Sequence, residues 1–271
     1  MALFETEVQL TCQLTSPHTV SVYDYGVSPE GLFYFVMEYL DGVTLGHLVK
    51  NCGPQPAARV IHFLRQVCSS LAEAHTFGLI HRDLKPDNLM VCSRGGVPDT
   101  IKVLDFGLAT VVSKFPERDQ VSAKMCGTPD YMSPESIAAP QTVDSRSDLY
   151  SLGAVGYFLL TGKTVFPAKN INALFQSHLN DVPQRPSERL GTPIDDDLQD
   201  LILRCLSKSP DKRPASPEEL SRLLGRCQSA DKWNPQDAVM HSVFRQVIPQ
   251  RKVPVSESHE CLQDTHVLRP V

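Results

Sequence analysis

The sequence predicts an α+β fold in which a few short strands near the start are followed by a mostly helical C-terminal part. Two observations predict this class. Aromatic and β-branched residues gather in short runs before residue 105, whereas the chain beyond residue 145 places apolar residues at helical spacing. Hydrophobic residues make up 41% of the 271 positions, which is enough to bury a core. Strands followed by many helices are typical of a mixed α+β protein.

The first elements are a helix and a strand hairpin. Residues 4–14 place apolar side chains at the spacing of one helix face. Residues 20–25 and 32–40 are rich in aromatic and β-branched side chains, which is typical of strands. The Pro-Glu-Gly sequence at 29–31 predicts the turn between them.

A long helix and two further strands occupy the middle of the chain. From Ala57 onward, apolar residues repeat every three or four positions, and Gly78 suits the end of that helix. Residues 89–91 and 101–104 are short apolar runs that we predict to be strands, joined by the turn-rich residues 93–100.

The second half is predicted to be helical. The last of its helices starts with a capping box, in which Ser216 is the N-cap, Pro217 the first helical residue and Glu219 the third. The predicted helices span residues 148–160, 198–206 and 217–227.

Two stretches lack periodicity. Residues 105–135 are polar and irregular, and loops of this length in compact domains are usually functional. After Cys227 the chain becomes polar, with one short helix predicted at 234–247 and a disordered tail at 249–271.

Composition excludes several classes of protein. A net charge of −5 argues against a chain built to coat nucleic acid. No apolar run approaches the roughly 20 residues of a membrane span. The eight cysteines include no C-x-x-C pair, and residues such as Cys68 and Cys205 lie in apolar contexts that predict buried thiols. With no signal peptide at the start, we expect a cytoplasmic protein.

Three motifs carry the chemistry. Residues 81–88 read HRDLKPDN, in a tight loop between the long helix and a strand. Residues 105–107 read DFG at the end of the next strand, and residues 133–135 read SPE at the end of the long loop. In this order and spacing they resemble the signature of eukaryotic-type serine/threonine protein kinases, especially the bacterial ones. The resemblance runs from about residue 4 to residue 227.

The resemblance implies a protein-kinase-like fold with a mostly helical C-terminal lobe and an incomplete N-terminal lobe. Residues 1–40 would form a partial N-terminal lobe, made of one helix and two strands. Residues 41–227 would form the C-terminal lobe, and residues 228–271 a polar tail.

The resemblance also implies a reaction, the transfer of the ATP γ-phosphoryl group to Ser or Thr hydroxyls of protein substrates. Asp83 matches the residue that accepts or orients the proton of the substrate hydroxyl. Lys85 matches the lysine that steadies the γ-phosphate and favours Ser/Thr over Tyr substrates. Asn88 and Asp105 match the ligands of Mg²⁺, which prefers oxygen donors.

The same resemblance assigns residues to nucleotide binding. Met37, Glu38 and Leu40 match the segment that receives adenine, and Met90 matches the floor beneath the base. Glu7 matches the helix glutamate that normally pairs with a strand lysine.

Two further sets of residues are implied around the long loop. Thr128 would seat the substrate residue and point back toward Asp83. Ser113 and Ser122, together with Thr110, are candidate phosphorylation sites whose added charge Arg82 would pair with.

The remaining matches are structural. His81 would pack inside the catalytic loop, and Asp148 would brace that loop. Glu135 would pair with Arg213 across the C-terminal lobe.

The sequence departs from the family at its start. No G-x-G-x-x-G motif occurs in the chain, and only six residues, none of them lysine, precede Glu7. A protein kinase needs both features around the phosphates, and the strands at 20–40 would keep an unpaired edge.

Three interpretations stay open at this point. The sequence is a fragment of an active kinase, or a pseudokinase-like binding or scaffold module, or a nucleotide-binding regulator without transfer. The intact Asp83, Asn88 and Asp105 favour the first, because a module without catalytic duty has no chemical need for all three.

Overall fold

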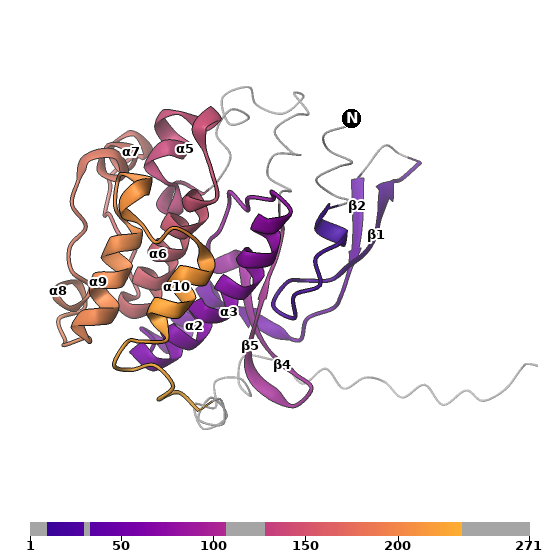
Figure 1. Cartoon of the computed structure of the whole chain (residues 1–271), viewed down its shortest axis with the longest axis horizontal. Helices are drawn as coiled ribbons and strands as arrows, with labels where there is room; N and C mark the ends of the chain where they lie inside the picture. The colour runs from indigo at the N-terminus through magenta and orange to yellow at the C-terminus, as the bar shows by residue number, and fades with distance from the viewer. Residues whose placement is uncertain (1–9, 30–32, 107–127, 235–271) are drawn as a thin grey trace, which may run out of the picture.

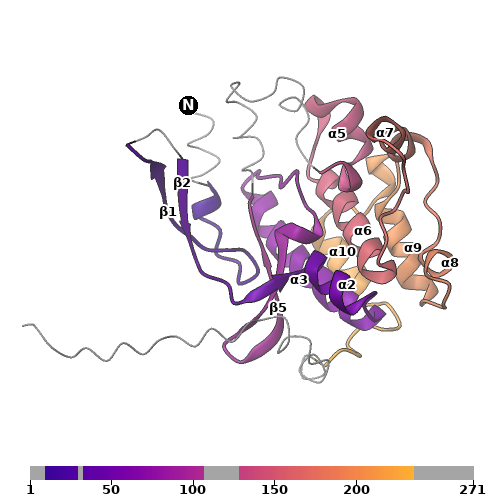
Figure 2. The ribbon, with the colours of Figure 1, turned by 180° about the vertical axis from the view of Figure 1, so that it is seen from behind.

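The computed structural model describes residues 10–29, 33–106 and 128–234. Helices α5 to α10 gather on one side of the molecule and the β1–β2 ribbon lies on the other, with β4 and β5 between them (Figures 1 and 2). The strands are β1 (Val22–Val27), β2 (Phe33–Met37), β3 (Gly42–Thr44), β4 (Leu89–Arg94) and β5 (Val97–Val103). The helices are α2 (Leu45–Cys52), α3 (Ala57–Thr76), α5 (Pro134–Ala138), α6 (Arg146–Thr161), α7 (Ile171–Asn180), α8 (Pro186–Leu190), α9 (Asp196–Cys205) and α10 (Pro217–Leu224).

The strands form two small antiparallel sheets. Strands β1 and β2 pair with each other, from Val22 opposite Met37 to Val27 opposite Phe33. They correspond to the two strands predicted at 20–25 and 32–40. Among the described residues no third strand joins them, and Tyr23 and Val36 on the ribbon are 68% and 45% exposed. The second sheet has the order β3-β4-β5.

The hairpin of β4 and β5 is longer than predicted. We expected residues 93–100 to be a loop, but both strands continue until only Gly95 and Gly96 connect them. These glycines have φ angles of 56° and 81°, which is left-handed geometry that glycine adopts without steric cost. A two-residue turn of this kind matches the twist of the strands, so the ladder extends to the turn.

Helix α3 confirms the predicted helix from Ala57. Its apolar stripe of Val60, Leu64, Val67 and Leu71 is buried, and Gly78 ends it with a φ of 72°. The helix packs against α10, α6 and β5, at the centre of one continuous hydrophobic core.

The other three predicted helices correspond to α6, α9 and α10, within one to three residues at each end. The Ser216 hydroxyl caps α10 by accepting a hydrogen bond from the Glu219 N–H at 3.3 Å. The Glu219 carboxylate accepts the N–H of Ala215 at 2.7 Å rather than that of Ser216, so the capping box is closed one residue earlier than expected.

Helices α2, α5, α7 and α8 were not predicted. They are five to ten residues long, and α5 and α8 have only five residues each, which is too short for an apolar period to show. Local side chains start some of them: the Thr44 hydroxyl accepts the N–H of His47 at the beginning of α2, and Asn170 accepts that of Ala173 at α7.

A carboxylate on α3 anchors the segment that precedes β1. Glu73 accepts the backbone N–H and hydroxyl of Thr15 at 2.8 and 2.7 Å, and the N–H of Ser16 at 2.8 Å. Farther along, the N–H of Val20 donates to the carbonyl of Val103 in β5 at 2.9 Å. The connection between the first helical residues and β1 is therefore fixed to the core at both ends.

The chain ends reach beyond the described ranges. Residues 10–12 are helical, in agreement with the predicted helix at 4–14, whose first part lies outside the described residues. The turn from residue 30, the helix predicted at 234–247 and the tail at 249–271 also lie outside them. Residues 228–234, where the predicted polar tail begins, form hydrogen bonds with Asp197 of α9 and Asp99 of β5.

The cysteines of the described part are free thiols. Four of them are buried, as predicted for cysteines in apolar sequence contexts: Cys68, Cys92, Cys205 and Cys227. In the same part of the chain, no helix combines the length and apolarity that crossing a bilayer requires.

Candidate active site

The loop between α3 and β4 holds the first motif in a tightly bonded conformation. Arg82 has a φ of 65°, a left-handed angle that is uncommon for residues other than glycine. Residues Pro86–Asn88 form one turn of 3-10 helix that leads into β4. Such strained geometry persists only where the surroundings hold it, and it concentrates at functional sites.

Asp83 is the centre of this loop. Its Oδ2 accepts a hydrogen bond from Lys85 Nζ at 2.6 Å and a longer one from Asn88 Nδ2 at 3.3 Å. Its Oδ1 accepts the N–H and the hydroxyl of Thr128 at 2.8 and 3.0 Å. The structure therefore brings Asp83, Lys85, Asn88 and Thr128 together, although Thr128 lies 45 positions from Asp83, within the long loop.

Asn88 and Asp105 are joined through the backbone. The carbonyl of Asn88 accepts the N–H of Leu104 at 2.9 Å, which fixes the residue before Asp105. The side-chain nitrogen of Asn88, Nδ2, donates a hydrogen bond to the backbone carbonyl of Asp83 at 2.8 Å. Within the described chain, the Asn88 Oδ1 and the Asp105 carboxylate have no hydrogen bond or ion pair. Two oxygen donors therefore remain available at this place.

Asp148, in the first turn of α6, holds the loop from beneath. Its carboxylate is buried and accepts the N–H of His81 at 2.9 Å and the N–H of Arg82 at 3.0 Å. It also accepts His75 Nε2 at 2.8 Å. His75 was not singled out from the sequence, because this contact joins residues 73 positions apart.

His81 is a fully buried side chain of the loop. Its Nε2 lies 2.8 Å from the carbonyl of Leu104, and its Nδ1 lies 3.3 Å from the N–H of Asp83. A carbonyl can only accept, so Nε2 carries the proton and Nδ1 accepts. The ring also lies 4.8 Å from that of Phe106, between centroids, which packs the first motif against the second.

The residues expected to bind the nucleotide are only partly brought together. Met37 and Asp105 line one small cavity of about 10 Å³, whose walls include Phe35 and Phe106. Leu40 is half-buried in the connection between β2 and β3, and Met90 is half-buried on β4; neither lines this cavity.

The side chain of Glu38 is used for an ion pair with β5. Its carboxylate accepts Lys102 Nζ at 2.7 Å, the N–H of Ser21 at 2.9 Å and a short contact from Arg94. Burial raises the pKa of Glu38, but these hydrogen bonds and cations outweigh burial and leave the pKa below its usual value. Only the backbone of Glu38 is left to contact a ligand. Nothing in the local sequence pattern marked Lys102 as a buried lysine.

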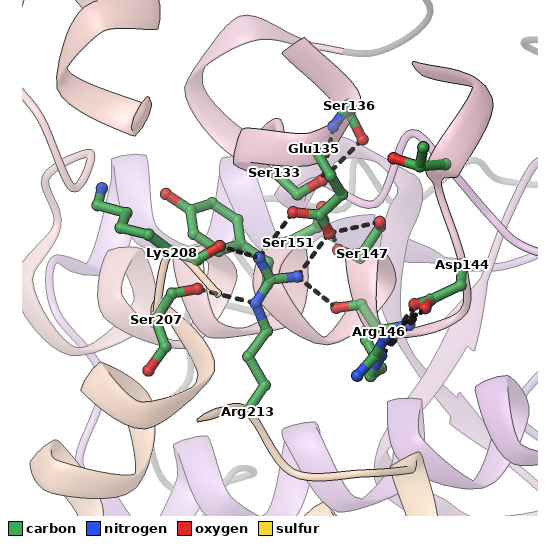
Figure 3. A network of polar contacts seen from close by, with 12 residues as sticks. Ser133, Glu135, Ser136, Asp144, Arg146, Ser147, Ser151, Ser207, Lys208 and Arg213 are labelled. Atoms are coloured by element: carbon green, nitrogen blue, oxygen red, sulfur yellow. Dashed lines mark hydrogen bonds and ion pairs between the residues drawn. The ribbon is translucent and has the colours of Figure 1, made fainter. Parts of the chain in front are cut away.

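Glu135, at the end of the long loop, forms a buried ion pair with Arg213 (Figure 3). Arg213 donates to both carboxylate oxygens at 2.6 and 2.7 Å, and to the carbonyls of Arg146, Ser207 and Lys208. All five N–H groups of the guanidinium are thus satisfied. Burial raises the pKa of Glu135, but the hydrogen bonds from Arg213 and Ser147 outweigh it and leave the pKa lowered.

Several expected site residues lie outside the described residues. They are Glu7, which was expected to contact the nucleotide through a lysine, and the three candidate phosphorylation sites Thr110, Ser113 and Ser122.

Known proteins are similar to this chain in sequence and in fold. The family model described as "Protein kinase domain" matches residues 2–223. The chain belongs to this family, which confirms the resemblance stated from the motifs.

The relatives with curated names are serine/threonine-protein kinases. Pkn3 of Myxococcus xanthus is 38% identical over 235 residues, which are 86% of this chain and 42% of that protein. PknB of Mycolicibacterium smegmatis is 39% identical over 220 residues, which are 80% of this chain and 34% of that protein. The chain spans less than half the length of these relatives.

Solved structures share the fold. The kinase domain of PknI from Mycobacterium tuberculosis matches with a TM-score of 0.63 and 25% identity, over 83% of this chain and 77% of that one. Rad53 matches with a TM-score of 0.67 and 24% identity, over 82% of this chain and 54% of that one. The predicted kinase-like α+β fold with a partial N-terminal lobe is therefore confirmed.

Proposed function

We propose that the chain is the catalytic part of a serine/threonine protein kinase, which transfers the γ-phosphoryl group of ATP to Ser or Thr hydroxyls. The observation that carries this proposal is the Asp83 carboxylate, which gathers Lys85, Asn88 and Thr128 within hydrogen-bond distance. Phosphoryl transfer needs positioning and charge neutralisation more than covalent chemistry, and these groups supply both.

The oxygen of the substrate hydroxyl would bond to the γ-phosphorus while the bond from that phosphorus to ADP breaks. Asp83 would accept the proton that this hydroxyl loses. The carboxylate already receives four donated hydrogen bonds. A substrate hydroxyl must therefore displace one of them, and the departure of the Lys85 ammonium would free a place on Oδ2. Lys85 would turn from Asp83 toward the phosphate, because its ammonium is a mobile point charge on a flexible stem.

The donors available near Asp83 fit Mg²⁺. Asn88 would offer its free Oδ1, and Asp105 its carboxylate. In the described ranges no three His, Cys, Asp or Glu side chains form a cluster that could hold a metal. Two protein ligands suit Mg²⁺, which usually keeps waters and binds substrate phosphates. When bound, the ion would neutralise charge on those phosphates.

Transfer of label from γ-labelled ATP to Ser/Thr peptides, and to the chain itself, tests the proposal. The matched control is Asp83→Asn, which keeps the shape of the side chain but removes its basicity. We expect transfer by the wild-type chain and a loss of about 10²- to 10⁴-fold in the variant, measured at a temperature at which both chains are folded.

Calorimetric titration with Mg–ATP separates the other interpretations. Binding without transfer would identify a nucleotide-binding regulator, and neither binding nor transfer would favour a scaffold module. Equal transfer by wild type and Asp83→Asn would show that Asp83 has another role.

We further propose the division and location expected from the sequence: a partial N-terminal lobe at 1–40, a C-terminal lobe at 41–227 and a tail at 228–271, in the cytoplasm. The free thiols of the described cysteines support a reducing compartment. Phosphorylation of Ser113 or Ser122 would add charge to the long loop, which phosphopeptide mapping after incubation with ATP tests.

A further inference from the structure

Trp233, the chain's only tryptophan, covers a buried ion pair between α3 and β5. Arg59 of α3 donates to both oxygens of Asp99 in β5, at 2.9 Å from Nε and 2.7 Å from Nη2. The indole N–H of Trp233 donates to the same carboxylate at 2.9 Å, and its ring lies 5.1 Å from the guanidinium of Arg59. Asp99 is completely buried by this arrangement.

Each nitrogen of the Arg59 guanidinium has a hydrogen-bond partner in this cluster. The Oε1 atom of Gln55 accepts a hydrogen bond from Arg59 Nη1 at 2.8 Å. The ring of Phe63 lies 5.1 Å from the Arg59 guanidinium. The backbone carbonyl of Asp99 accepts Gln66 Nε2 at 2.9 Å. A buried ion pair is favourable only when its remaining donors and acceptors are satisfied and water is kept out. Trp233 does both.

Trp233 is held there by the segment that follows α10. The N–H of Gln228 donates to Asp197 at 2.6 Å, Ser229 contacts Asp195, and Asp231 pairs with Arg65 of α3 at 3.2 Å. Residues 228–234 therefore form a strap that runs from α9 across α3 to the β4–β5 hairpin.

The strap reaches β5 where the strand is irregular. Asp99 has a φ of 56°, and the pairing of β4 with β5 shifts register between Cys92 and Arg94. A left-handed residue inside a strand persists only when its surroundings hold it. The bonds from Arg59 and Trp233 hold this one.

The other end of β5 leads into the candidate active site. Lys102 pairs with Glu38, whose backbone borders the proposed nucleotide site, and the next residue but one, Leu104, donates to the carbonyl of Asn88. Asp105 follows directly. A change in the position of β5 would therefore move both the proposed metal ligands, Asn88 and Asp105, and the segment at Glu38 that borders the proposed adenine site.

We infer that Trp233 is a positioning residue for the nucleotide and metal site, acting through Asp99 and β5. The reference to nucleotide rests on the function proposed above. The link from Trp233 to β5 does not.

The test compares wild type with Trp233→Ala, Trp233→Phe and the control Lys232→Ala, all in the full chain. Phe keeps a ring over Arg59 but lacks the N–H donor, and Lys232 is an exposed strap residue whose side chain has no polar contact among the described residues. We expect the Kd for Mg–ATP to rise about tenfold in Trp233→Ala, less in Trp233→Phe, and not at all in Lys232→Ala. The KM for ATP should rise more than kcat falls.

Trp233 also provides a direct signal, because no other indole contributes to the fluorescence. Its emission should change when Mg–ADP is titrated into wild type. A lower unfolding temperature in Trp233→Ala with unchanged Mg–ATP affinity would overturn the inference and leave Trp233 a purely structural residue.

Hydrogen exchange keeps the test independent of the proposed function. If wild type binds no nucleotide, that function fails, but Trp233→Ala should still speed exchange of the amides from 97 to 106. Faster exchange confined to the strap would overturn the link to β5.

Discussion

Thr128 donates both its backbone N–H and its hydroxyl to a single oxygen of Asp83, at 2.8 and 3.0 Å. The two residues are 45 positions apart, and Thr128 lies in the long loop, shortly before α5. The contact therefore makes the orientation of Asp83 depend on the conformation of the segment that leads into α5. In the proposed kinase, the segment that seats the substrate would also aim the base.

Substitution of Thr128 should separate its two hydrogen bonds. Thr128→Ala keeps the N–H bond but removes the hydroxyl, and a hydrogen bond to a charged group is worth about 1.5–3 kcal/mol. We expect the transfer rate to fall about tenfold, with Thr128→Ser restoring most of it. The measurement is the initial rate of label transfer from ATP at saturating nucleotide. A serine variant as slow as the alanine variant would mean that the methyl group, not the hydroxyl, matters.

Removal of Glu135 should be costly. Arg213 has a completely buried side chain, so Glu135→Ala leaves a buried, unpaired cation, for which the expected cost is about 3–5 kcal/mol. The matched control is Asp196→Ala, whose partner Arg185 is 38% exposed and whose loss should cost less than about 1 kcal/mol. Urea unfolding of both variants measures the difference, and equal losses would contradict the importance of burial here.

Asp148→Asn should loosen the loop that carries Asp83. The two oxygens of the buried carboxylate accept three hydrogen bonds. An asparagine side chain has only one oxygen, and its NH₂ group would face N–H groups that also donate. We expect a loss of about 1–3 kcal/mol in stability and faster hydrogen exchange at the amides of His81 and Arg82. The control Asp144→Asn, at a half-exposed pair beside the same helix, should leave this exchange unchanged. Slow exchange in Asp148→Asn would show that other contacts suffice.

His178 should make stability fall with acidification. Burial, followed by the charge of Lys208, lowers the pKa of His178 from 6.5 to about 4. Between these values the unfolded chain binds the proton and the folded chain does not. Its contribution, about 3 kcal/mol, is therefore complete above pH 6.5 and is lost as the pH falls toward 4.

Unfolding free energies of wild type and His178→Gln across this range test the effect, since glutamine can still bond the Tyr150 hydroxyl, 2.8 Å from His178 Nδ1. The variant should show a shallower slope between pH 6.5 and 5. Identical slopes would mean that His178 takes up its proton in the folded chain as well.

The sequence predicted the longer elements better than the short ones, for a physical reason. Helix α3 has enough turns for its apolar stripe to be distinguished from chance, and the same holds for α6. Helix α2 depends on a single cap at Thr44 and on the close approach of Asp87, which leaves no room for a Cβ at Gly46. Such contacts appear only once the chain is folded.

The candidate site divides in the same way. Asp83, Lys85 and Asn88 lie within six positions of one another, so a local motif identifies them. His75 and Lys102 reach the site through contacts over 73 and 64 positions, and no local pattern marks them. Trp233 is a further case, because its partner Asp99 is 134 positions away.

The three hydrogen bonds that Glu73 accepts from Thr15 and Ser16 have a mechanical consequence. They attach the start of this connection firmly to α3. A displacement of the chain before Thr15 is therefore passed to α3 through Glu73, whereas the start of the β1–β2 ribbon is tied to β5 by the Val20–Val103 bond.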